Sequence, residues 1–481
     1  MRHQNRTSIC VAIWAIFAFC VGTLTTSAND DDNNQNNASQ VISKIAFGSC
    51  ANQSKPCPIW STIDSYSPDL LLLLGDNIYA DIVDGRLKPS TPARIASAYQ
   101  QLADLPAFDR LRKSVPILAT WDDHDYGNND AGREWEHKRA ASNLFHDFFS
   151  TPANSPLREQ EGVYQSRIFG PPGKRIQIIL LDTRYFRSEL DKADEPMPGF
   201  RARPYVPAVQ GDSEMLGDQQ WKWLRDELLK PAELRVLCSS IQVLSNDHPF
   251  EKWGNFPSEQ TRLFELIRDC EASGVVIISG DRHLGEISLD PSSVGYPLHD
   301  VTASGLNQAN QGWRPTEPNR LRLAALQHGN HFGSIEVDWH ATDPEVRLQL
   351  RHDDGNIAVQ TKFGLSLLRA QRKPLPLAEG AINPAAALQR KAGEQVVVQF
   401  RVQGGRKIGN PDRILLNSEK DFRSPGNFTV VVNQDALKGK LAKAGLEAFR
   451  GRTLRVTGKI SPYRGVNQLA VDAADQIEFV D

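Results

Sequence analysis

Residues 70–81 read LLLLLGDNIYAD: five consecutive leucines, a glycine, and a polar segment with two aspartates and a tyrosine. A continuous apolar run of this length is typical of a strand that is buried on both faces, as in the sheets of α/β proteins. The polar residues would therefore leave the sheet at the end of a central strand. This stretch predicts both the fold class and the position of a candidate site.

Five further apolar runs are followed by polar residues, and we expect each to contain a strand. They are VISKIAFGSC (41–50), VPILATWDDHD (115–125), RIQIILLDTR (175–184), RVLCSSIQV (235–243) and GVVIISGDRH (274–283). Amphipathic helical patterns lie between them, and this alternation predicts an α/β domain over 41–375. In such sheets, sites gather beyond the carboxyl ends of the strands.

Residues 391–481 show a different pattern, with short alternating segments that are typical of a small β-rich domain. We predict an OB-like β-barrel there, with one helix over 435–449, after a linker at 376–390. The 15 Lys/Arg against 10 Asp/Glu in this region give a mild basic bias, but aromatic side chains on which bases could stack are few, which favours a solvated barrel surface. Contact with a polyanion is the alternative.

The composition is that of an ordinary soluble protein. The chain has 481 residues, of which 40% are hydrophobic and 23% are charged. The formal net charge of -3 gives no overall field that would attract nucleic acid or acidic lipid. We therefore predict no specific nucleic-acid partner.

The N-terminus has the pattern of a secretory signal peptide. Two arginines precede an apolar stretch over 9–24, and small residues follow at 26–28. A membrane anchor is the alternative, but the stretch is shorter than the ~20 residues that span a bilayer. We expect residues 1–28 to be removed, residues 29–40 to form a disordered spacer, and the mature chain to be secreted or periplasmic with no membrane span.

The first candidate motif is the end of the leucine run. Asp76 and Tyr79 lie three residues apart in a loop that leaves a strand, so both can turn toward one point. A carboxylate and a phenolate suit a hard cation such as Fe(III), and a carboxylate can bridge two metals. The alternative is that Asp76 caps a turn and Tyr79 is a core aromatic.

The second motif is TWDDHDYGNND at 120–130, which places four acidic residues, a histidine and two asparagines next to an apolar run. The fixed glycine and the distal glutamate of an EF-hand are missing, which excludes that type of calcium loop. A solvated acidic loop is the alternative. Acids crowded after a buried strand would repel one another unless cations were present, so the motif favours a metal site.

The third motif, SGDRH at 279–283, brings a carboxylate and an imidazole to another strand end. Asp281 and His283 alternate along the chain, so both can point the same way, while Arg282 would meet an anion or lie outside. Arg184, at a fourth strand end, would clamp an anionic substrate or form a salt bridge with Asp182.

Six cysteines are present, but two lie within the predicted signal peptide. Of the remaining four, Cys50 follows an apolar run, where a thiolate beside a trivalent metal would be stabilised. A buried structural cysteine is the alternative. Cys57, Cys238 and Cys270 would then form at most one disulfide, and Cys57 could equally stay a buried free thiol.

Taken together, the motifs resemble a known family. They are GSC (48–50), GDNIYAD (75–81), WDDHDYGNND (121–130), LLDTRYFR (180–187) and SGDRHLGE (279–286). In this order and spacing they are similar to the PhoD-type alkaline phosphatases of the metallophosphoesterase superfamily, over about residues 41–368. GD-x-x-YAD also resembles the purple acid phosphatase motif whose tyrosine binds Fe(III). The resemblance implies an α/β/β/α sandwich for residues 41–375.

The resemblance also implies roles for individual residues. The implied metal ligands are Cys50, Asp76, Tyr79, Asp123, Asp281 and His283, with Cys50, Tyr79 and His283 on the iron side. The implied catalytic residues are His124 and Asp123. The implied substrate-binding residues are Arg184, Arg282 and Asn77. The carboxylates of Asp123 and Asp281 are hard oxygen ligands. They favour Ca2+ over zinc in the second metal site, next to Fe3+ in the first.

The implied function is a secreted, metal-dependent phosphoesterase that hydrolyses phosphate mono- and/or diesters by attack of a metal-activated hydroxide. A phospholipase or phosphodiesterase specialised on diesters would use the same metals and is one alternative. A non-enzymatic calcium-dependent extracellular binding protein is another. It would explain the acidic motif, but not Cys50, Tyr79 and His283.

Overall fold

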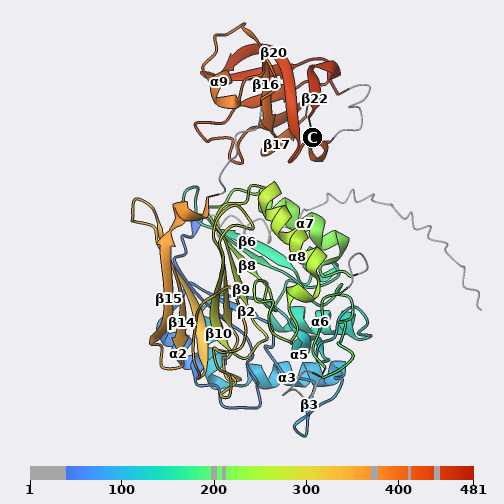
Figure 1. Cartoon of the computed structure of the whole chain (residues 1–481), viewed down its shortest axis with the longest axis vertical. Helices are drawn as coiled ribbons and strands as arrows, with labels where there is room; N and C mark the ends of the chain where they lie inside the picture. The colour runs from blue at the N-terminus through green and yellow to red at the C-terminus, as the bar shows by residue number, and fades with distance from the viewer. Residues whose placement is uncertain are drawn as a thin grey trace, which may run out of the picture.

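The computed structural model describes residues 39–196, 203–208, 213–369, 377–409, 413–437 and 445–480, whose arrangement is drawn in Figure 1. The predicted signal peptide and all but the last two residues of the predicted spacer lie outside these ranges. Within them, no helix combines the length and the apolar content needed to cross a bilayer.

The first domain is built on two sheets, and the first of these has six strands in the order β15-β14-β13-β1-β2-β5. Its strands are β1 (Lys44–Gly48), β2 (Leu70–Leu74), β5 (Ile117–Thr120), β13 (His331–Asp338), β14 (Glu345–His352) and β15 (Ile357–Gly364). Strands β1, β2 and β5 are parallel, and β13 to β15 are antiparallel to their neighbours. A small hairpin of β3 (Ile82–Val83) and β4 (Arg86–Leu87) stands apart from this sheet.

The second sheet has seven strands in the order β12-β10-β11-β9-β8-β7-β6. Its strands are β6 (Gln165–Phe169), β7 (Ile176–Leu180), β8 (Leu234–Cys238), β9 (Val275–Ser279), β10 (Gly285–Asp290), β11 (Leu298–Ala303) and β12 (Arg322–Ala325). Strands β7, β8, β9 and β11 are parallel. Each of the six apolar runs therefore contains a strand, as predicted.

The leucines of β2 explain why two sheets form. Leu70, Leu72 and Leu74 pack in a cluster that contains the apolar side chains of the second sheet. Leu71 and Leu73 pack in a second cluster, with side chains from helices on the other face. Because successive side chains of a strand point to opposite faces, a strand between two cores needs an apolar residue at every position.

Both ends of β2 are fixed by polar or backbone interactions. The Asp69 Oδ2 atom accepts hydrogen bonds from the backbone N–H groups of Ser43 (2.8 Å) and Lys44 (2.9 Å). The Asp69 N–H donates to the Lys44 carbonyl at 2.7 Å. At the other end, Gly75 has a φ of +98°, which turns the chain out of the sheet.

Helices cover the outer faces of the two sheets. Those against the first sheet are α2 (Ile59–Tyr66), α3 (Pro92–Ala103), α4 (Pro106–Ser114) and α6 (Lys138–Phe148), and those against the second are α7 (Gly217–Leu229) and α8 (Pro257–Asp269). The start of α3 is set by Thr91, whose side chain accepts a hydrogen bond from the Arg94 N–H. The result is a mixed α/β domain in which helices flank two facing sheets (Figure 1).

The C-terminal region forms a separate sheet in the order β16-β20-β21-β19-β18-β17, with β22 paired to β20. Its strands are β16 (Gln395–Arg401), β17 (Gly404–Ile408), β18 (Arg413–Asn417), β19 (Thr429–Val432), β20 (Thr453–Tyr463), β21 (Val466–Val471) and β22 (Ile477–Phe479). Strands β16 and β17 lie at opposite ends of this order but follow each other directly in the chain. The two edges of the sheet are therefore linked by two residues.

Two further features concern the predicted linker and helix. Residues 377–390 include α9 (Pro384–Leu388), whose Ala387 is buried in the core of the C-terminal region, so this part of the predicted linker packs with that region. Residues 438–444 of the predicted helix over 435–449 lie outside the described residues; of the rest, 435–437 form a turn and Leu446–Ala448 a short 3-10 helix.

The C-terminal region contacts the first domain at the amino ends of β7, β8 and β9. A cavity between them is bordered by Arg175, Ala232 and Ser273, which lie one or two residues before these strands, and by Lys420 and Asp421. The Lys420 Nζ atom donates to two backbone carbonyls of the first domain. This contact therefore lies at the sheet edge opposite to the one where the polar motifs gather.

The four cysteines of the described residues are all free. The predicted optional disulfide among Cys57, Cys238 and Cys270 is therefore not formed, and each of the three packs in or against an apolar core cluster.

Candidate functional site

The predicted site residues leave the sheets through strained turns. Cys50 follows β1, Asp76 follows β2, and Asp281 and His283 follow β9. All four have left-handed backbone conformations, with φ values of 64°, 50°, 69° and 55°. For residues other than glycine such conformations cost on the order of 1 kcal/mol or more each, and they persist where the surrounding fold enforces them.

Gly75 allows the loops after β2 and β5 to approach each other. A Cβ atom at this position would lie 2.6 Å from the Asp122 backbone nitrogen and 2.7 Å from the Trp121 carbonyl carbon. Any side chain would push the loops apart, so glycine is needed for contact as well as for its positive φ. This close approach brings Asp76 next to the acidic motif.

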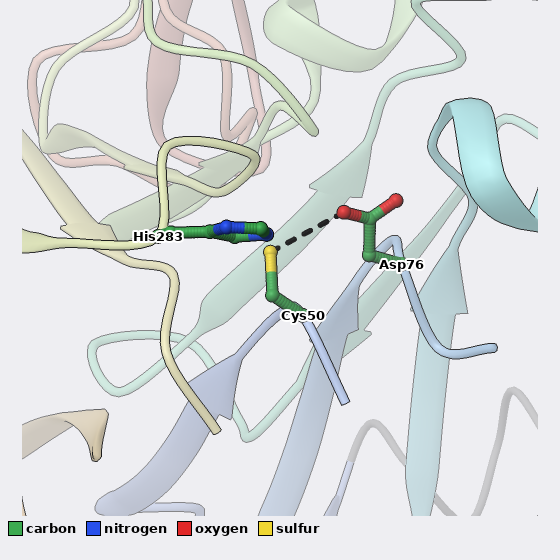
Figure 2. Close-up of side chains that lie close together, drawn as sticks. All are labelled: Cys50, Asp76 and His283. Atoms are coloured by element: carbon green, nitrogen blue, oxygen red, sulfur yellow. Dashed lines mark hydrogen bonds between the residues drawn. The ribbon is translucent and has the colours of Figure 1, made fainter. Parts of the chain in front are cut away.

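The first cluster joins Cys50, Asp76 and His283, whose candidate ligand atoms lie within 4.8 Å of one another (Figure 2). The Cys50 Sγ atom is 3.3 Å from Asp76 Oδ2. Tyr79 belongs to the same cluster, because its hydroxyl donates to Asp76 Oδ2 at 3.2 Å and lies 3.1 Å from His283 Nε2. The structure thus brings together Cys50, Tyr79 and His283, the three residues expected on the iron side, around Asp76.

Two further clusters adjoin the first. One contains Asp76, Asp123 and His124, and the other contains Asp122, Asp123 and Asp281. Asp76 is shared with the first cluster and Asp123 is shared between these two. The six predicted metal ligands therefore form one continuous set, to which the structure adds Asp122 and His124.

The charges of this set are poorly balanced by the protein itself. Burial raises the pKa of Asp76 well above its ordinary value, although the His124 charge opposes this. Burial and the charges of Asp122 and Asp123 raise the pKa of Asp281, and burial raises that of Asp122 to about 7. The buried atoms Asp76 Oδ1 and Asp122 Oδ2 accept no hydrogen bond from the described residues. Such oxygens fit bound cations.

Cys50 lies in a polar environment that sequence reasoning did not predict. Its Sγ atom is 3.1 Å from the Ser304 Oγ atom and 3.3 Å from the Ser49 Oγ atom. Ser304 comes from the loop after β11 and also accepts a hydrogen bond from the His283 N–H at 2.7 Å. Burial raises the pKa of the Cys50 thiol to about 12, so a thiolate here needs a cation beside it.

His124 is held by a residue whose role was not predicted. Its Nδ1 atom lies 2.6 Å from Asp81 Oδ1, and both side chains are buried. Burial lowers the pKa of His124, but the charges of Asp123, Asp76 and Asp81 outweigh this and raise it above its ordinary value. Asp81 is the last residue of GDNIYAD, so the motif contained the signal for this pair.

The acidic motif also supplies Asp123, which is fixed by backbone donors. The His124 N–H donates to Asp123 Oδ1 at 2.9 Å, and the Asp130 N–H donates to Oδ2 at 2.7 Å. Burial acts to raise the pKa of Asp123, but the charges of His124 and Arg184 and the Asp130 N–H lower it overall. Asp123 is therefore the acid of this motif that is most stable as a carboxylate.

The clusters open into a cavity of about 250 Å³. The described residues that line it are Asp76, Asp123, His124, Asn129, Asp130, Tyr205, Phe250, Glu251, Asp281, Arg282, His283 and Asn310. The cavity thus combines candidate cation ligands with one arginine and one aromatic wall. A phosphate ester would fit this combination of charges and space.

The three predicted substrate-binding residues lie in different places. Arg282 lines the cavity, and its Nη2 atom donates to both carboxylate oxygens of Glu317 at 3.0 Å. Asn77 is buried behind the cavity, where its side-chain amide donates to the Thr120 carbonyl at 3.0 Å. Neither Asn77 nor Arg184 is among the described lining residues.

Arg184 is fully buried between two acids. Its guanidinium contacts Asp122 Oδ1 at 2.5 Å and Glu251 Oε2 at 2.8 Å, and its backbone N–H donates to Asp182. The side chain therefore pairs with Asp122 and Glu251 rather than with the predicted Asp182, and it does not face the cavity. Its effect on the site is indirect, through the position of Asp122.

Comparison with known proteins agrees with this geometry. The sequence model of PhoD-like phosphatases matches residues 45–292, just over half of the chain. The chain belongs to this family. Strands β13 to β15 of the PhoD-like domain lie beyond the matched segment, but β13 pairs with β1 and completes the first sheet.

Two known proteins show the extent of the similarity. Alkaline phosphatase D of Bacillus subtilis (strain 168) is 24% identical over 250 residues, which is 45% of this chain and 41% of that protein. The match thus spans about two fifths of the relative. A solved structure described as "Structure of PhoD" aligns with a TM-score of 0.54 at 17% identity, over 70% of this chain and 73% of its own. This likeness supports the fold of the PhoD-like domain.

Proposed function

We propose that this chain is a secreted, metal-dependent phosphoesterase that hydrolyses phosphate mono- and/or diesters. The observation that carries the proposal is the cavity in which overlapping clusters of cation ligands meet His124 and Arg282. Membership of the PhoD-like phosphatase family supports it, as does the name of the relative, alkaline phosphatase D. Phosphoryl transfer depends mainly on positioning and charge stabilisation, and this site is built from charged groups.

The donor set fits two kinds of cation. Cys50, Asp76, Tyr79 and His283 would hold Fe3+, because a thiolate and a phenolate stabilise a trivalent ion. The carboxylates that adjoin them would hold Ca2+, which prefers oxygen ligands. When bound, such cations neutralise phosphate oxygens and activate water. The Asp76 Oδ1 atom accepts no hydrogen bond from the described residues, which supports Asp76 as a ligand that both cations would share.

The chain's own groups would orient the ester and move a proton. Asp81 holds Nδ1 of His124, so Nε2 is the atom available to stabilise a phosphate oxygen or to protonate the leaving oxygen. The His124 ring also lies against Tyr79, with 4.2 Å between ring centroids, which restricts its rotation. Arg282, held by Glu317, would bind a further phosphate oxygen.

The proposal is tested by removing and restoring the cations. Dialysis against a chelator should lower kcat/KM on aryl phosphate mono- and diesters by about 100-fold or more. Restoring Fe3+ and Ca2+ together should recover activity, while either ion alone should not. Full activity in chelated protein that elemental analysis shows to be free of metal would overturn the proposal.

A spectroscopic test addresses the iron ligands separately from activity. Protein loaded with Fe3+ should absorb visible light through the phenolate of Tyr79, and Tyr79→Phe should abolish this band. Tyr126→Phe is the matched control, because this nearby buried tyrosine donates to the Gly132 carbonyl instead. An unchanged band in Tyr79→Phe would remove Tyr79 from the set of ligands.

Two other functions remain distinguishable by experiment. Matched kinetics on mono- and diesters separate a general phosphoesterase from a phospholipase or phosphodiesterase. A non-enzymatic calcium-binding protein would contain calcium without iron. The cluster of Cys50, Tyr79 and His283 argues against this last function, because Ca2+ binds oxygen ligands rather than a thiol or an imidazole.

We also propose export of the chain and an OB-like barrel for the C-terminal region. The arginines and the apolar stretch at the N-terminus support export, and cell fractionation with N-terminal sequencing of the mature protein tests it. The link between β16 and β17 supports a closed barrel, because it joins the two edges of one sheet. Polyanion contact by this region stays a prediction.

A further inference from the structure

A second cavity adjoins the one that contains the candidate metal ligands. It has a volume of about 230 Å³, and Asp130, Tyr205 and Phe250 line both cavities. Its other lining residues are Lys192, Arg203, Pro204 and Pro249. Because the two spaces share three residues, a molecule with its phosphate in the first cavity can extend into the second.

The two cavities differ in charge. Five of the twelve described residues that line the first cavity are acids and one is an arginine, whereas the second contains two cations, Lys192 and Arg203, and a single acid. That acid, Asp130, accepts a hydrogen bond from the Tyr205 hydroxyl at 2.5 Å. Lys192 and Arg203 are exposed, and neither forms an ion pair within the described part of the chain. The Lys192 Nζ atom lies 5.5 Å from the centre of the Tyr205 ring, and the second cavity thus offers positive charge that no described acid pairs, next to the proposed reaction site.

Three nearby acids do not border the second cavity. Asp191, Asp194 and Glu195 lie in the same segment as Lys192, but they are not among the described residues that border the space. An anion within the cavity would therefore meet Lys192 and Arg203 first.

The remaining walls are apolar and rigid. Phe250 is 39% exposed, and its ring lies 4.2 Å from the Arg282 guanidinium, at the boundary of the two cavities. Two proline rings and the Tyr205 ring form the other surfaces. Such surfaces suit a flat or compact apolar group.

Backbone hydrogen bonds hold these walls in place. The Tyr205 N–H donates to the Pro249 carbonyl at 2.9 Å, and the Ala193 N–H donates to the Pro204 carbonyl at 2.9 Å. Lys192 and Tyr205 also form an antiparallel β-bridge. The segments that carry the two cations are therefore tied to each other and to the segment that carries Phe250, so the cavity is formed before a ligand binds.

We propose that this second cavity is a subsite for the alcohol portion of the substrate, and that it selects alcohols that combine an apolar ring with an anionic group. The inference rests on the proposed phosphoesterase activity and specifies its substrate class. Lys192 and Arg203 attract the anion, while Tyr205 and Phe250 contact the ring. The reacting phosphate lies in the first cavity, where His124 and the candidate metal ligands act on it.

A matched pair of substrates isolates the charge preference. The pair is 4-(carboxymethyl)phenyl phosphate and 4-(carbamoylmethyl)phenyl phosphate, each as the monoester and as the methyl diester. The methylene group keeps the two leaving groups nearly equal in reactivity, so the ratio of their kcat/KM values reports on binding of the carboxylate. At low ionic strength the wild-type chain should favour the carboxylate by about tenfold, and 0.5 M salt should reduce the preference.

Two double variants test where the preference originates. In Lys192→Gln/Arg203→Gln the ratio should fall to about one. Arg110→Gln/Lys222→Gln is the control for net charge, because it removes two exposed cations that border neither cavity, and its ratio should stay at the wild-type value. Equal ratios in the wild type and in Lys192→Gln/Arg203→Gln would overturn the subsite.

Failure of the subsite is distinguishable from failure of the proposed function. Hydrolysis of the carboxamide esters with no preference for the carboxylate would leave the phosphoesterase in place and eliminate the subsite. No hydrolysis of any of the four esters by metal-loaded protein would eliminate both. Thermal unfolding of each variant, expected within about 1 °C of the wild type for exposed side chains, shows that the fold is intact.

Discussion

The strand ends of the PhoD-like domain and the turns of the C-terminal region use the same backbone conformation for different purposes. Within the described residues 377–480, Arg464 is the single non-glycine residue with a left-handed φ, and it lies in the hairpin turn between β20 and β21. Around the candidate site, Cys50, Asp76, Asp281 and His283 all share this conformation. In the hairpin it reverses the chain, whereas at the site it directs side chains toward one point.

Unpaired polar atoms show the same difference. In the described part of the C-terminal region, the buried side-chain atoms without a hydrogen-bond partner are the Nε atoms of Arg413 and Arg455. At the site they include carboxylate oxygens of Asp76 and Asp122. Buried acids without partners lower stability, and they persist where they bind or react. The comparison predicts that changes at the site affect activity first and changes in the C-terminal region affect stability first.

The largest expected effect follows from Asp76→Asn. It removes the charge shared by two candidate metal clusters while keeping the side-chain shape, so kcat/KM on aryl phosphates should fall by on the order of 10³-fold. The free energy of unfolding without metal should stay the same or rise, because a buried carboxylate is lost. Steady-state kinetics and denaturant unfolding measure the two effects.

Asp84→Asn is the matched control for this change. Asp84 is exposed and has a φ of 52°, close to the 50° of Asp76, and asparagine tolerates this conformation. Its activity should stay within about twofold of the wild type. Equal losses in the two variants would show that the effect of Asp76→Asn is not specific to the candidate metal site.

A smaller effect is expected from a pair of cysteine changes. Cys50→Ser should reduce kcat/KM by about 100-fold and lower the iron content, because the thiol adjoins Asp76 and His283. Cys238→Ser places a hydroxyl in an apolar core and should instead cost about 2 kcal/mol of stability, with normal activity per folded molecule. Elemental analysis and thermal unfolding separate the two outcomes. Lost stability in Cys50→Ser together with lost activity in Cys238→Ser would contradict the assignment of Cys50 to the site and of Cys238 to the core.

Asp81→Asn should have a moderate effect, because Asp81 acts through His124. Loss of the carboxylate at 2.6 Å from Nδ1 would leave the imidazole less well oriented, so kcat should fall about tenfold with little change in KM. Metal content should be normal. A normal kcat would show that His124 is positioned without Asp81.

The smallest effect on activity is expected in the C-terminal region. Val430 of β19 is fully buried, and Val430→Ala should lower the stability of this region by about 2 kcal/mol. Hydrolysis of small aryl esters should be unchanged, because the region contacts the first domain at the sheet edge opposite to the site. Hydrogen exchange resolves the local loss of stability; a parallel loss of activity would show coupling between the domains.

Much of the first domain was predictable, because its strands are buried on both faces and so appear as continuous apolar runs. Those runs located β1, β2, β5, β7, β8 and β9 and the polar residues after them. Strands β13 to β15 have weaker patterns, since polar residues interrupt their apolar ones, and they were not predicted as separate strands.

The candidate site was predicted from short motifs at the strand ends and from Cys50, which follows an apolar run. Asp76 with Tyr79, and Asp281 with His283, come from single loops, and the structure brings them together. Ser304 lies 254 positions from Cys50 in the chain, and no local pattern marks such a contact. The partners of Arg184 were also missed, because a buried ion pair depends on which loops meet in three dimensions.

The uniform composition of β2 has a consequence for how the strand finds its place. With leucine at five successive positions, a slip of one residue would leave a leucine in nearly every buried position of both cores. Hydrophobic burial therefore cannot distinguish the correct register of β2 from a register that is shifted by one residue. The register is fixed instead at the two ends of the strand. Asp69 accepts hydrogen bonds from the backbone at the start of β1, and at position 75 only glycine fits against Asp122. Two residues at the ends of a strand of uniform composition thus determine the position of Asp76.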